Sequence, residues 1–387
     1  MSKRKQLSCK ICFLISAFVW CYISFFEYGR LSVMDSMNCE VYLFNYSYGF
    51  IPRAVMGSLY SIFFKDYTID NILIFSLVIH IICALIIIGC IHLLFKKCEQ
   101  FRGKNMCEYC LSLLLVSAFS NRANFGRNDE ILLTLSLLAI MLIVYEKFEW
   151  VAIPISALGV CVHEGYVFLY VNVILVLFLY KAYTRKSIKY LIYCITTFVV
   201  VSILFLYFMK IGNINEIAFN DISQKSLALM GKGYYEEFLR AELLGEDLFL
   251  HELSYRPYCF TELGFFIILS FPIVEILYTY IKKIFKNKTI VCFIFLSGLI
   301  TLIPEYLLRL DFGRWTIALI FYLATMTIAF ILLGEIDIKK ALNTTLELIS
   351  QKRMNWCILS FSLVCVLMAQ RMTILSSLFN RIIANAP

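Results

Sequence analysis

Charged side chains are scarce in this sequence. Asp, Glu, Lys and Arg make up 16% of the 387 residues, whereas hydrophobic residues make up 61%. Soluble domains average about 25% charged and about 45–50% apolar residues, so a soluble fold of this length cannot hide so many apolar side chains. The composition excludes a soluble enzyme, a disordered chain and a nucleic-acid-binding domain, and it predicts that lipid surrounds the protein.

Several common functional motifs are also missing. The sequence contains neither Gly-x-Gly-x-x-Gly nor Gly-x-x-x-x-Gly-Lys-[Ser/Thr], so nothing indicates nucleotide hydrolysis. No dense group of Asp and Glu suggests a dedicated metal cage, and we expect no cofactor beyond a divalent cation that arrives with a phosphate. The fifteen cysteines lie mostly inside apolar runs and are interpreted as small buried hydrophobes.

Long apolar blocks are abundant instead. A block of about 17–25 apolar residues is long enough to cross a membrane as a helix. We therefore predict an all-α polytopic membrane protein with about eleven transmembrane helices (10–12). The predicted spans are 11–27, 71–95, 106–120, 130–146, 150–163, 165–181, 189–210, 260–281, 289–304, 315–334 and 355–371.

The distribution of basic residues orients these spans. The net charge is +8, and more than half of the Lys and Arg fall in alternate connecting segments. Cytoplasmic loops carry such an excess, which predicts the N-terminus inside and the C-terminus outside. The cytoplasmic segments are then 1–10, 96–105, 147–149, 181–189, 282–288 and 335–353.

The chain is predicted to be one transmembrane domain, 1–387, with two sizeable segments on the outer side. Residues 28–70 form an outer loop, in which 51–64 is apolar but too short to span and suits a helix lying in the interface. Residues 211–259 form a large outer loop that we expect to be a helical cap.

Four polar clusters lie near the outer ends of spans. The first follows span one and contains Asp35, Glu40 and the stretch 46–57. Arg53 in this stretch suits a bidentate contact with phosphate. An acidic residue just past the first span can serve as a base. The alternative is an ordinary loop in which Arg53 meets lipid headgroups.

The second cluster, 121–130, places Arg127 and Asp129 at the start of an apolar helix. Positive side chains at a helix start make an anion cradle, although Arg127 can instead pair with Glu130 three residues on. The fourth cluster, 305–315, has a similar ambiguity, because Asp311 and Arg314 are also three residues apart.

The third cluster is His163-Glu164, at the joint between two adjoining spans. Ionisable groups at membrane depth are costly and usually functional. Residue 167 is Val, so the metalloprotease motif H-E-x-x-H is absent. The alternative is a hydrogen-bonded pair that stabilises a helix hairpin. For His80, inside the second block, we expect a helix–helix contact.

The combination of arginines, carboxylates and a histidine on one side suits a lipid-borne diphosphate. Arginines would hold the diphosphate and neutralise the leaving group, and a carboxylate or histidine would take the proton of an attacking hydroxyl. The predicted diphosphate ligands are Arg53, Arg127 and Arg314, with Glu40 and Asp311 as further substrate-binding residues. The candidate bases or orienting groups are Asp35, Asp129, His163 and Glu164.

Four short motifs of the sequence resemble those of a family group. The stretch G-F-x-x-R-x-x-x-G at 49–57, G-R-x-D at 126–129, His-Glu at 163–164 and D-x-G-R-W at 311–315 are similar to bacterial O-antigen and capsule repeat-unit polymerases and to C-type glycosyltransferases. The resemblance implies glycosidic-bond formation on the outer face of the bacterial cytoplasmic (inner) membrane. It implies an undecaprenyl-diphosphate-linked oligosaccharide as substrate. The lack of a large C-terminal outer domain favours the polymerase.

Three alternatives remain open at this stage. They are a transferase that uses a polyprenyl-phosphate sugar, a flippase for lipid-linked oligosaccharide, and a non-catalytic membrane partner of a polysaccharide complex. Charge concentrated at one face disfavours the flippase, which needs charge along a central cavity. The expected partners are the lipid-linked oligosaccharide, membrane lipid and a chain-length regulator protein, with no nucleic acid.

Overall fold

The computed structural model describes residues 39–99, 128–210, 212, 214–231, 236–244, 282, 288–304 and 312–335. Every regular element in these ranges is a helix. The short 3₁₀ segments are η1 (Val41–Leu43), η2 (Tyr46–Tyr48), η4 (Glu149–Val151) and η6 (Ile300–Leu302). The α-helices are α3 (Ala54–Phe63), α4 (Ile69–Glu99), α6 (Asp129–Val144), α7 (Ala152–Val162), α8 (Tyr166–Leu169), α9 (Val171–Arg185), α10 (Ile188–Lys210), α11 (Glu216–Met230), α12 (Glu236–Leu244), α14 (Thr289–Ser297) and α16 (Phe312–Leu332).

The all-helical prediction is confirmed for these residues, whereas the count of eleven spans is not. Two helices, Ile69–Leu94 and Ile188–Lys210, are long and apolar enough to cross a membrane. The predicted span 165–181 is broken at Tyr170 into α8 and α9, and 289–304 is broken at Gly298 into α14 and η6. The predicted spans 11–27, 106–120, 260–281 and 355–371 lie outside the described residues.

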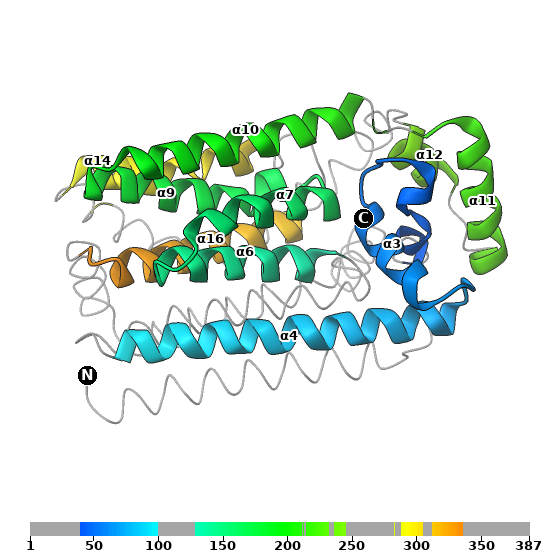
Figure 1. Cartoon of the computed structure of the whole chain (residues 1–387), viewed down its shortest axis with the longest axis horizontal. Helices are drawn as coiled ribbons and strands as arrows, with labels where there is room; N and C mark the ends of the chain where they lie inside the picture. Colours follow the sequence, from blue (N-terminus) through cyan, green and yellow to red (C-terminus); the bar gives the residue numbers. More distant parts are fainter. Residues whose placement is uncertain are drawn as a thin grey trace, which may run out of the picture.

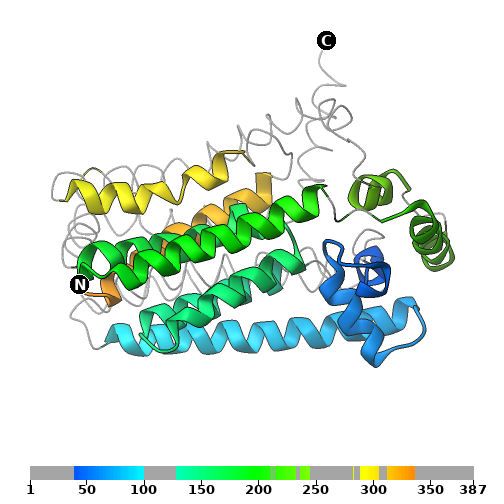
Figure 2. The ribbon, with the colours of Figure 1, turned by 45° about the horizontal axis from the view of Figure 1, so that its top comes forward.

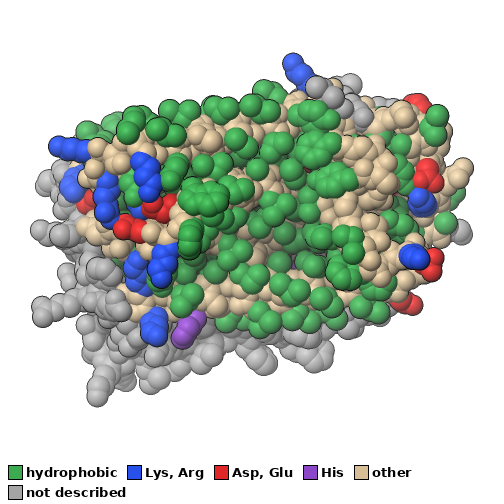
Figure 3. Space-filling view, in the orientation of Figure 1, with side chains coloured by type: hydrophobic (Ala, Val, Ile, Leu, Met, Phe, Trp, Pro, Cys, Tyr) green, Lys and Arg blue, Asp and Glu red, His purple; other side chains and the backbone are tan. Residues whose placement is uncertain are grey.

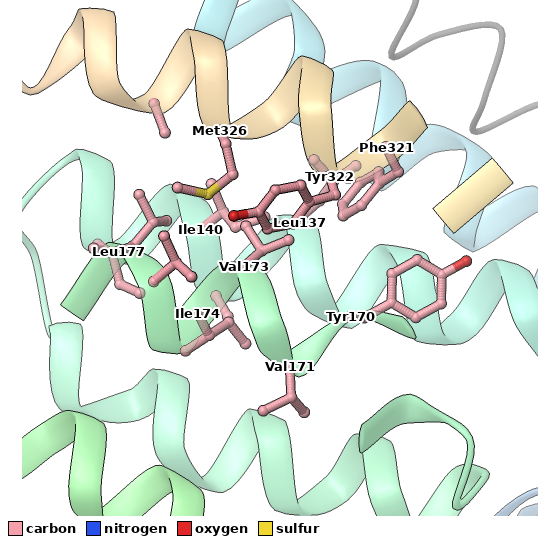
Figure 4. Packing of buried hydrophobic residues seen from close by; sticks show 14 of the residues in the cluster. Leu137, Ile140, Tyr170, Val171, Val173, Ile174, Leu177, Phe321, Tyr322 and Met326 are labelled. Atoms are coloured by element: carbon pink, nitrogen blue, oxygen red, sulfur yellow. The ribbon is translucent and has the colours of Figure 1, made fainter. Parts of the chain in front are cut away.

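The long helices lie roughly along one direction and form a bundle (Figures 1 and 2). Helices α6, α9 and α16 contribute to its centre, which is filled by large apolar side chains (Figure 4). Leu137, Val173, Phe321 and Met326 are among them, and all are almost fully buried. Close packing of such side chains is the main source of stability inside the bundle.

One end of the bundle carries the extra helices α3, α11 and α12, which we call the cap together with η1 and η2 (Figure 1). Leu43, Phe44, Phe219 and Leu239 are buried together where these elements meet. The predicted outer helix in 51–64 is present as α3, and the described part of 211–259 forms α11 and α12. Both predicted outer segments therefore contribute to the same end.

The opposite end carries a concentration of Lys and Arg (Figure 3). Lys97 Nζ donates to the Val144 carbonyl oxygen at 2.8 Å, and Lys288 Nζ donates to Glu335 Oε1 at 3.0 Å. Lys181 contacts Glu149. These contacts bring together residues from segments that the sequence assigns to one side of a membrane, so the described parts of those segments share one end.

Lys181 is buried at this end, with a side chain 1% exposed. Its ammonium contacts Glu149 and lies 3.3 Å from Glu146 Oε1. Removing one partner of a buried ion pair leaves an uncompensated charge and costs about 3–5 kcal/mol. We expect Lys181→Met to lower the free energy of unfolding by this amount, measured as a lower melting temperature of the purified protein in detergent.

Lys189 provides the matched control for this substitution. It lies 3.3 Å from the other oxygen of Glu149, but its side chain is 53% exposed. An exposed ion pair contributes about 0–1 kcal/mol. Equal losses of melting temperature for Lys181→Met and Lys189→Met would contradict the buried-pair interpretation.

Candidate functional site

The turn that leads into α3 holds Arg53 in an unusual backbone conformation. Arg53 is the residue immediately before the helix and has φ of 61°, in the left-handed region. For a residue other than glycine, this conformation costs about 1–3 kcal/mol and persists only where the surroundings enforce it. Gly49, with φ of 111°, makes the preceding turn. The residue that carries the positive charge therefore has a strained backbone conformation.

Gly57 fixes α3 against the segment that precedes it. A Cβ atom at Gly57 would lie 1.9 Å from the Phe44 carbonyl oxygen and 2.7 Å from that of Tyr42. Only glycine permits this approach between the helix and η1. The two ends of the G-F-x-x-R-x-x-x-G stretch therefore have a backbone role, and its central residue Arg53 carries the charge.

Arg53 binds Glu164 of the third predicted cluster. Its Nε donates to Glu164 Oε2 at 3.2 Å and its Nη2 to Glu164 Oε1, a bidentate contact across 111 positions of the chain. Both side chains are largely buried. Burial alone would raise the pKa of the Glu164 carboxyl, but the charge of Arg53, joined by that of His163 when His163 is protonated, holds that pKa well below its usual range. Glu164 is therefore ionised at neutral pH.

His163 lies beside this pair, at the end of α7. The backbone N–H of Gly165 donates to His163 Nδ1 at 3.0 Å, and the same nitrogen is 3.7 Å from Glu164 Oε1. A neutral imidazole that accepts at Nδ1 carries its proton on Nε2. His163 is therefore set up to donate a hydrogen bond through Nε2, and an orienting or electrophilic role fits it better than that of a base.

The start of α6 packs against the same turn. Asn128 Nδ2 donates to the carbonyl oxygen of Val162 at 3.1 Å, one residue before His163. Asp129 and Glu130 follow in the first turn of α6 and are both buried. Asp129 is thus on an element that reaches the site.

Glu130 is linked to α4. Its Oε2 contacts His80 Nδ1 across the interface between α4 and α6. This is the helix–helix contact expected for His80. Neither its partner nor the distance in sequence, 50 positions, was predictable from spacing.

The beginning of α16 lies toward the same end of the bundle. Thr301 Oγ1 donates to the Phe168 carbonyl oxygen at 3.1 Å, and the rings of Tyr170 and Phe321 are 5.4 Å apart. Trp315 is buried in the first turns of α16. The described segments on either side of the fourth cluster, η6 and α16, therefore contact the chain just after His163 and Glu164.

The remaining predicted site residues lie inside the cap or lie wholly or partly outside the described part of the chain. Asp35, Arg127 and Asp311 lie outside the described residues, and Arg314 is described only as part of the α16 backbone. Glu40 is fully buried, and its Oε1 accepts a hydrogen bond from Ser226 Oγ at 2.7 Å. It connects η1 to α11 inside the cap.

A second polar contact joins the cap to the turn before α3. Tyr48 Oη donates to Asp221 Oδ2 at 2.5 Å, and Lys225 Nζ donates to the same oxygen at 2.6 Å. Hydrogen bonds from Lys225 and Tyr48 lower the pKa of Asp221. Sequence analysis predicted neither contact: Asp221 and Lys225 are four residues apart on α11, whereas Tyr48 is 173 positions from Asp221.

Comparisons with known proteins do not assign a family or a function to this site. No protein-family model, no curated protein and no solved structure matches the chain. Within the described part of the chain, no three His, Cys, Asp or Glu side chains are grouped so as to hold a metal ion.

Proposed function

We propose that the chain is a multi-pass protein of the bacterial inner membrane. Support comes from the outward surface of α10, where Ile188, Phe198 and Ile203 are among the most exposed side chains. The exposed apolar residues of this helix recur every three to four positions, the spacing of one helix face. A stripe of this kind needs lipid or protein to cover it, and lipid is the solvent that the composition requires.

Within this membrane protein, we infer a glycosyltransferase of the polymerase type. It would join undecaprenyl-diphosphate-linked oligosaccharide repeats on the outer face of the membrane, in O-antigen or capsule synthesis. The observation that carries the proposal is the Arg53–Glu164 pair beside His163. Arg53 immediately precedes α3 of the cap, at the opposite end of the bundle from the end of α9 and the start of α14, where Lys181 and Lys288 lie in the chain (Figure 1).

The chemistry requires a cation that binds a diphosphate and stabilises it as it leaves. A guanidinium has five N–H donors, more than one carboxylate uses, so Arg53 can hold Glu164 and a phosphate oxygen together. His163 Nε2–H supplies another donor. Glu164 orients Arg53 and remains ionised.

The proposed step exchanges one bond at the anomeric carbon. A hydroxyl oxygen of the acceptor repeat attacks the anomeric carbon of the donor chain and forms the new glycosidic bond. The bond between that carbon and the diphosphate oxygen breaks, and undecaprenyl diphosphate leaves with the bonding pair. The hydroxyl proton passes to a carboxylate, for which Asp35 and Asp129 are the candidates. Arg53 stabilises the charge that develops on the leaving diphosphate.

The described centre of the bundle favours an enzyme over a flippase. Leu137, Ile140, Ile174 and Met326 fill the space between α6, α9 and α16 (Figure 4). A carrier of a charged headgroup needs polar side chains through the membrane depth. The described region between α6, α9 and α16 has a close-packed apolar core instead.

Deleting the gene in its native host tests the proposal. We expect lipid-linked single repeats to accumulate and polymer to disappear, and re-expression to restore polymer. The accumulated repeats should be accessible to a glycosidase added outside spheroplasts. Accumulation that only lysis exposes would indicate a flippase, repeats lacking one sugar would indicate a single-sugar transferase, and unchanged polymer would refute the proposal.

A further inference from the structure

Four aromatic side chains form a partly exposed surface next to the site. We call Tyr46, Phe50, Tyr207 and Phe208 the aromatic shelf. The rings of Tyr46 and Phe50 are stacked at 5.6 Å between centroids, and Phe50 lies 5.4 Å from the Tyr207 ring and 5.1 Å from the Phe208 ring. Phe50 is 44% exposed and Tyr46 is 37% exposed. The shelf joins the η2 turn to the end of α10.

Two connections hold the shelf beside Arg53 and His163. The Tyr46 hydroxyl interacts electrostatically with the Cys161 thiol, two residues before His163. The backbone N–H of Tyr46 donates to Ser58 Oγ at 2.8 Å, which ties the turn to α3. Phe50 is three residues before Arg53, so their Cα atoms are at most about 11 Å apart. A sugar ring with its attached diphosphate is long enough to reach across this interval.

We propose that the aromatic shelf stacks against a pyranose ring of the lipid-linked oligosaccharide. This ring is either the sugar linked to the diphosphate or the sugar that accepts the transferred chain. This inference rests on the proposed function and names the substrate contact of the same site. One face of a pyranose presents C–H groups that pack on an aromatic ring, while its hydroxyls point outward to polar neighbours. Phe50 would supply the ring face, and Tyr46, His163 and Glu164 the polar groups around it.

A sugar fits this position better than a lipid chain does. Lipid-facing side chains of α10 are mainly aliphatic, as at Ile188, Ile195 and Ile203. The shelf departs from this pattern because it is entirely aromatic, it includes two tyrosines, and its Phe50 is three residues before Arg53, which binds the ionised Glu164. Aromatic residues with a polar tip suit a surface that is apolar on one side and polar on the other.

Binding of the free oligosaccharide tests the shelf without requiring catalysis. The probe is the repeat released by mild acid from the lipid-linked pool of the host, and its binding to the full-length protein in lipid nanodiscs is measured by saturation-transfer NMR. We expect Phe50→Ala to weaken binding about 10-fold, the loss of one good ring contact. Phe50→Tyr, which keeps the ring, should bind within about 2-fold of wild type. Phe198→Ala is the control, because Phe198 is an exposed phenylalanine of α10 away from the shelf.

The outcomes separate the shelf from the proposed function. Equal binding by wild type and Phe50→Ala, in a protein whose deletion still abolishes polymer, overturns the shelf and leaves the polymerase intact. If Phe50→Ala instead reduces retention of undecaprenyl phosphate and not of the oligosaccharide, the occupant is the lipid chain and the shelf proposal is wrong. Oligosaccharide binding that depends on Phe50, in a host whose polymer survives gene deletion, supports the shelf and refutes the polymerase.

Discussion

Replacing Arg53 with glutamine is expected to reduce polymer formation by about 10²–10³-fold, the loss seen when one preorganised donor to a developing charge is removed. Arg53 would bind the diphosphate with a charge that glutamine lacks. Polymer length distribution and amount on the cell surface give the measurement. Protein in the membrane fraction, quantified in parallel, separates lost chemistry from lost protein.

The backbone conformation at position 53 does not favour either residue. Residue 53 has a left-handed conformation that is unfavourable for arginine and glutamine alike, so the strain is similar in both proteins. The change also leaves Glu164 buried without the positive charge that lowers its pKa, so the pKa of Glu164 should rise. Arg53→Lys keeps the charge but cannot make the bidentate contact, and it should retain an intermediate amount of activity.

Arg185→Gln is the matched control. Arg185 also contacts a glutamate, Glu146, but at the basic end of the bundle. It should leave polymer formation within about 2-fold of wild type, as expected for an exposed ion pair. Normal polymer in Arg53→Gln, or equal losses in both variants, would contradict the role assigned to Arg53.

Adding a single methyl group at Gly57 is expected to destabilise the cap by about 3 kcal/mol or more. The new Cβ atom would overlap the Phe44 carbonyl oxygen, which is backbone and cannot turn aside as a flexible side chain can. Either α3 or η1 must move, and movement of α3 carries Arg53 away from Glu164. Gly57→Ala should therefore lower both the melting temperature and the amount of polymer.

Gly89→Ala gives the comparison for this effect. Gly89 is in α4, and among the described residues no heavy atom outside the adjoining backbone of α4 lies within 4 Å of the position its Cβ would occupy. Alanine is also the better helix former by about 1 kcal/mol. Its melting temperature should equal or exceed that of wild type, and an unaffected Gly57→Ala protein would show that the close contact with Phe44 does not constrain the cap.

The sequence predicted helices better than their interruptions. The long apolar blocks 71–95 and 189–210 located α4 and α10, and the short block 51–64 located α3. The break at Tyr170 was missed because the residues around it are as apolar as those of an unbroken helix. A tertiary contact lies next to the break: Asn172 Nδ2 donates to the Gly298 carbonyl oxygen at 2.9 Å, between segments 126 positions apart.

For the site too, the sequence indicated the residues but not their distant partners. The sequence selected Arg53, His163 and Glu164 individually, and their residue types near predicted helix ends were sufficient for that. It offered only local partners for charged groups, such as Arg127 for Glu130. In the structure Glu130 contacts His80 and Arg53 contacts Glu164. Pairing across such separations depends on how the helices pack, which residue spacing does not encode.

Glu40 illustrates a different difficulty. An acidic residue after the first span suggested a substrate contact, but in the structure its carboxylate is buried under α11, where Ser226 donates to it. The 186 positions between the two residues carry no spacing signal. The role in substrate binding that we predicted for Glu40 would have to be indirect, through the position of the cap.

Reconstitution of the purified chain tests the central claim most directly. The protein in liposomes is supplied with lipid-linked repeats purified from the deletion strain, and both glycan length and released undecaprenyl diphosphate are followed. We predict a ladder of lengthening glycans, with one undecaprenyl diphosphate released for each bond formed, and its loss in Arg53→Gln. Binding of the lipid-linked repeat with neither lengthening nor diphosphate release would contradict the account.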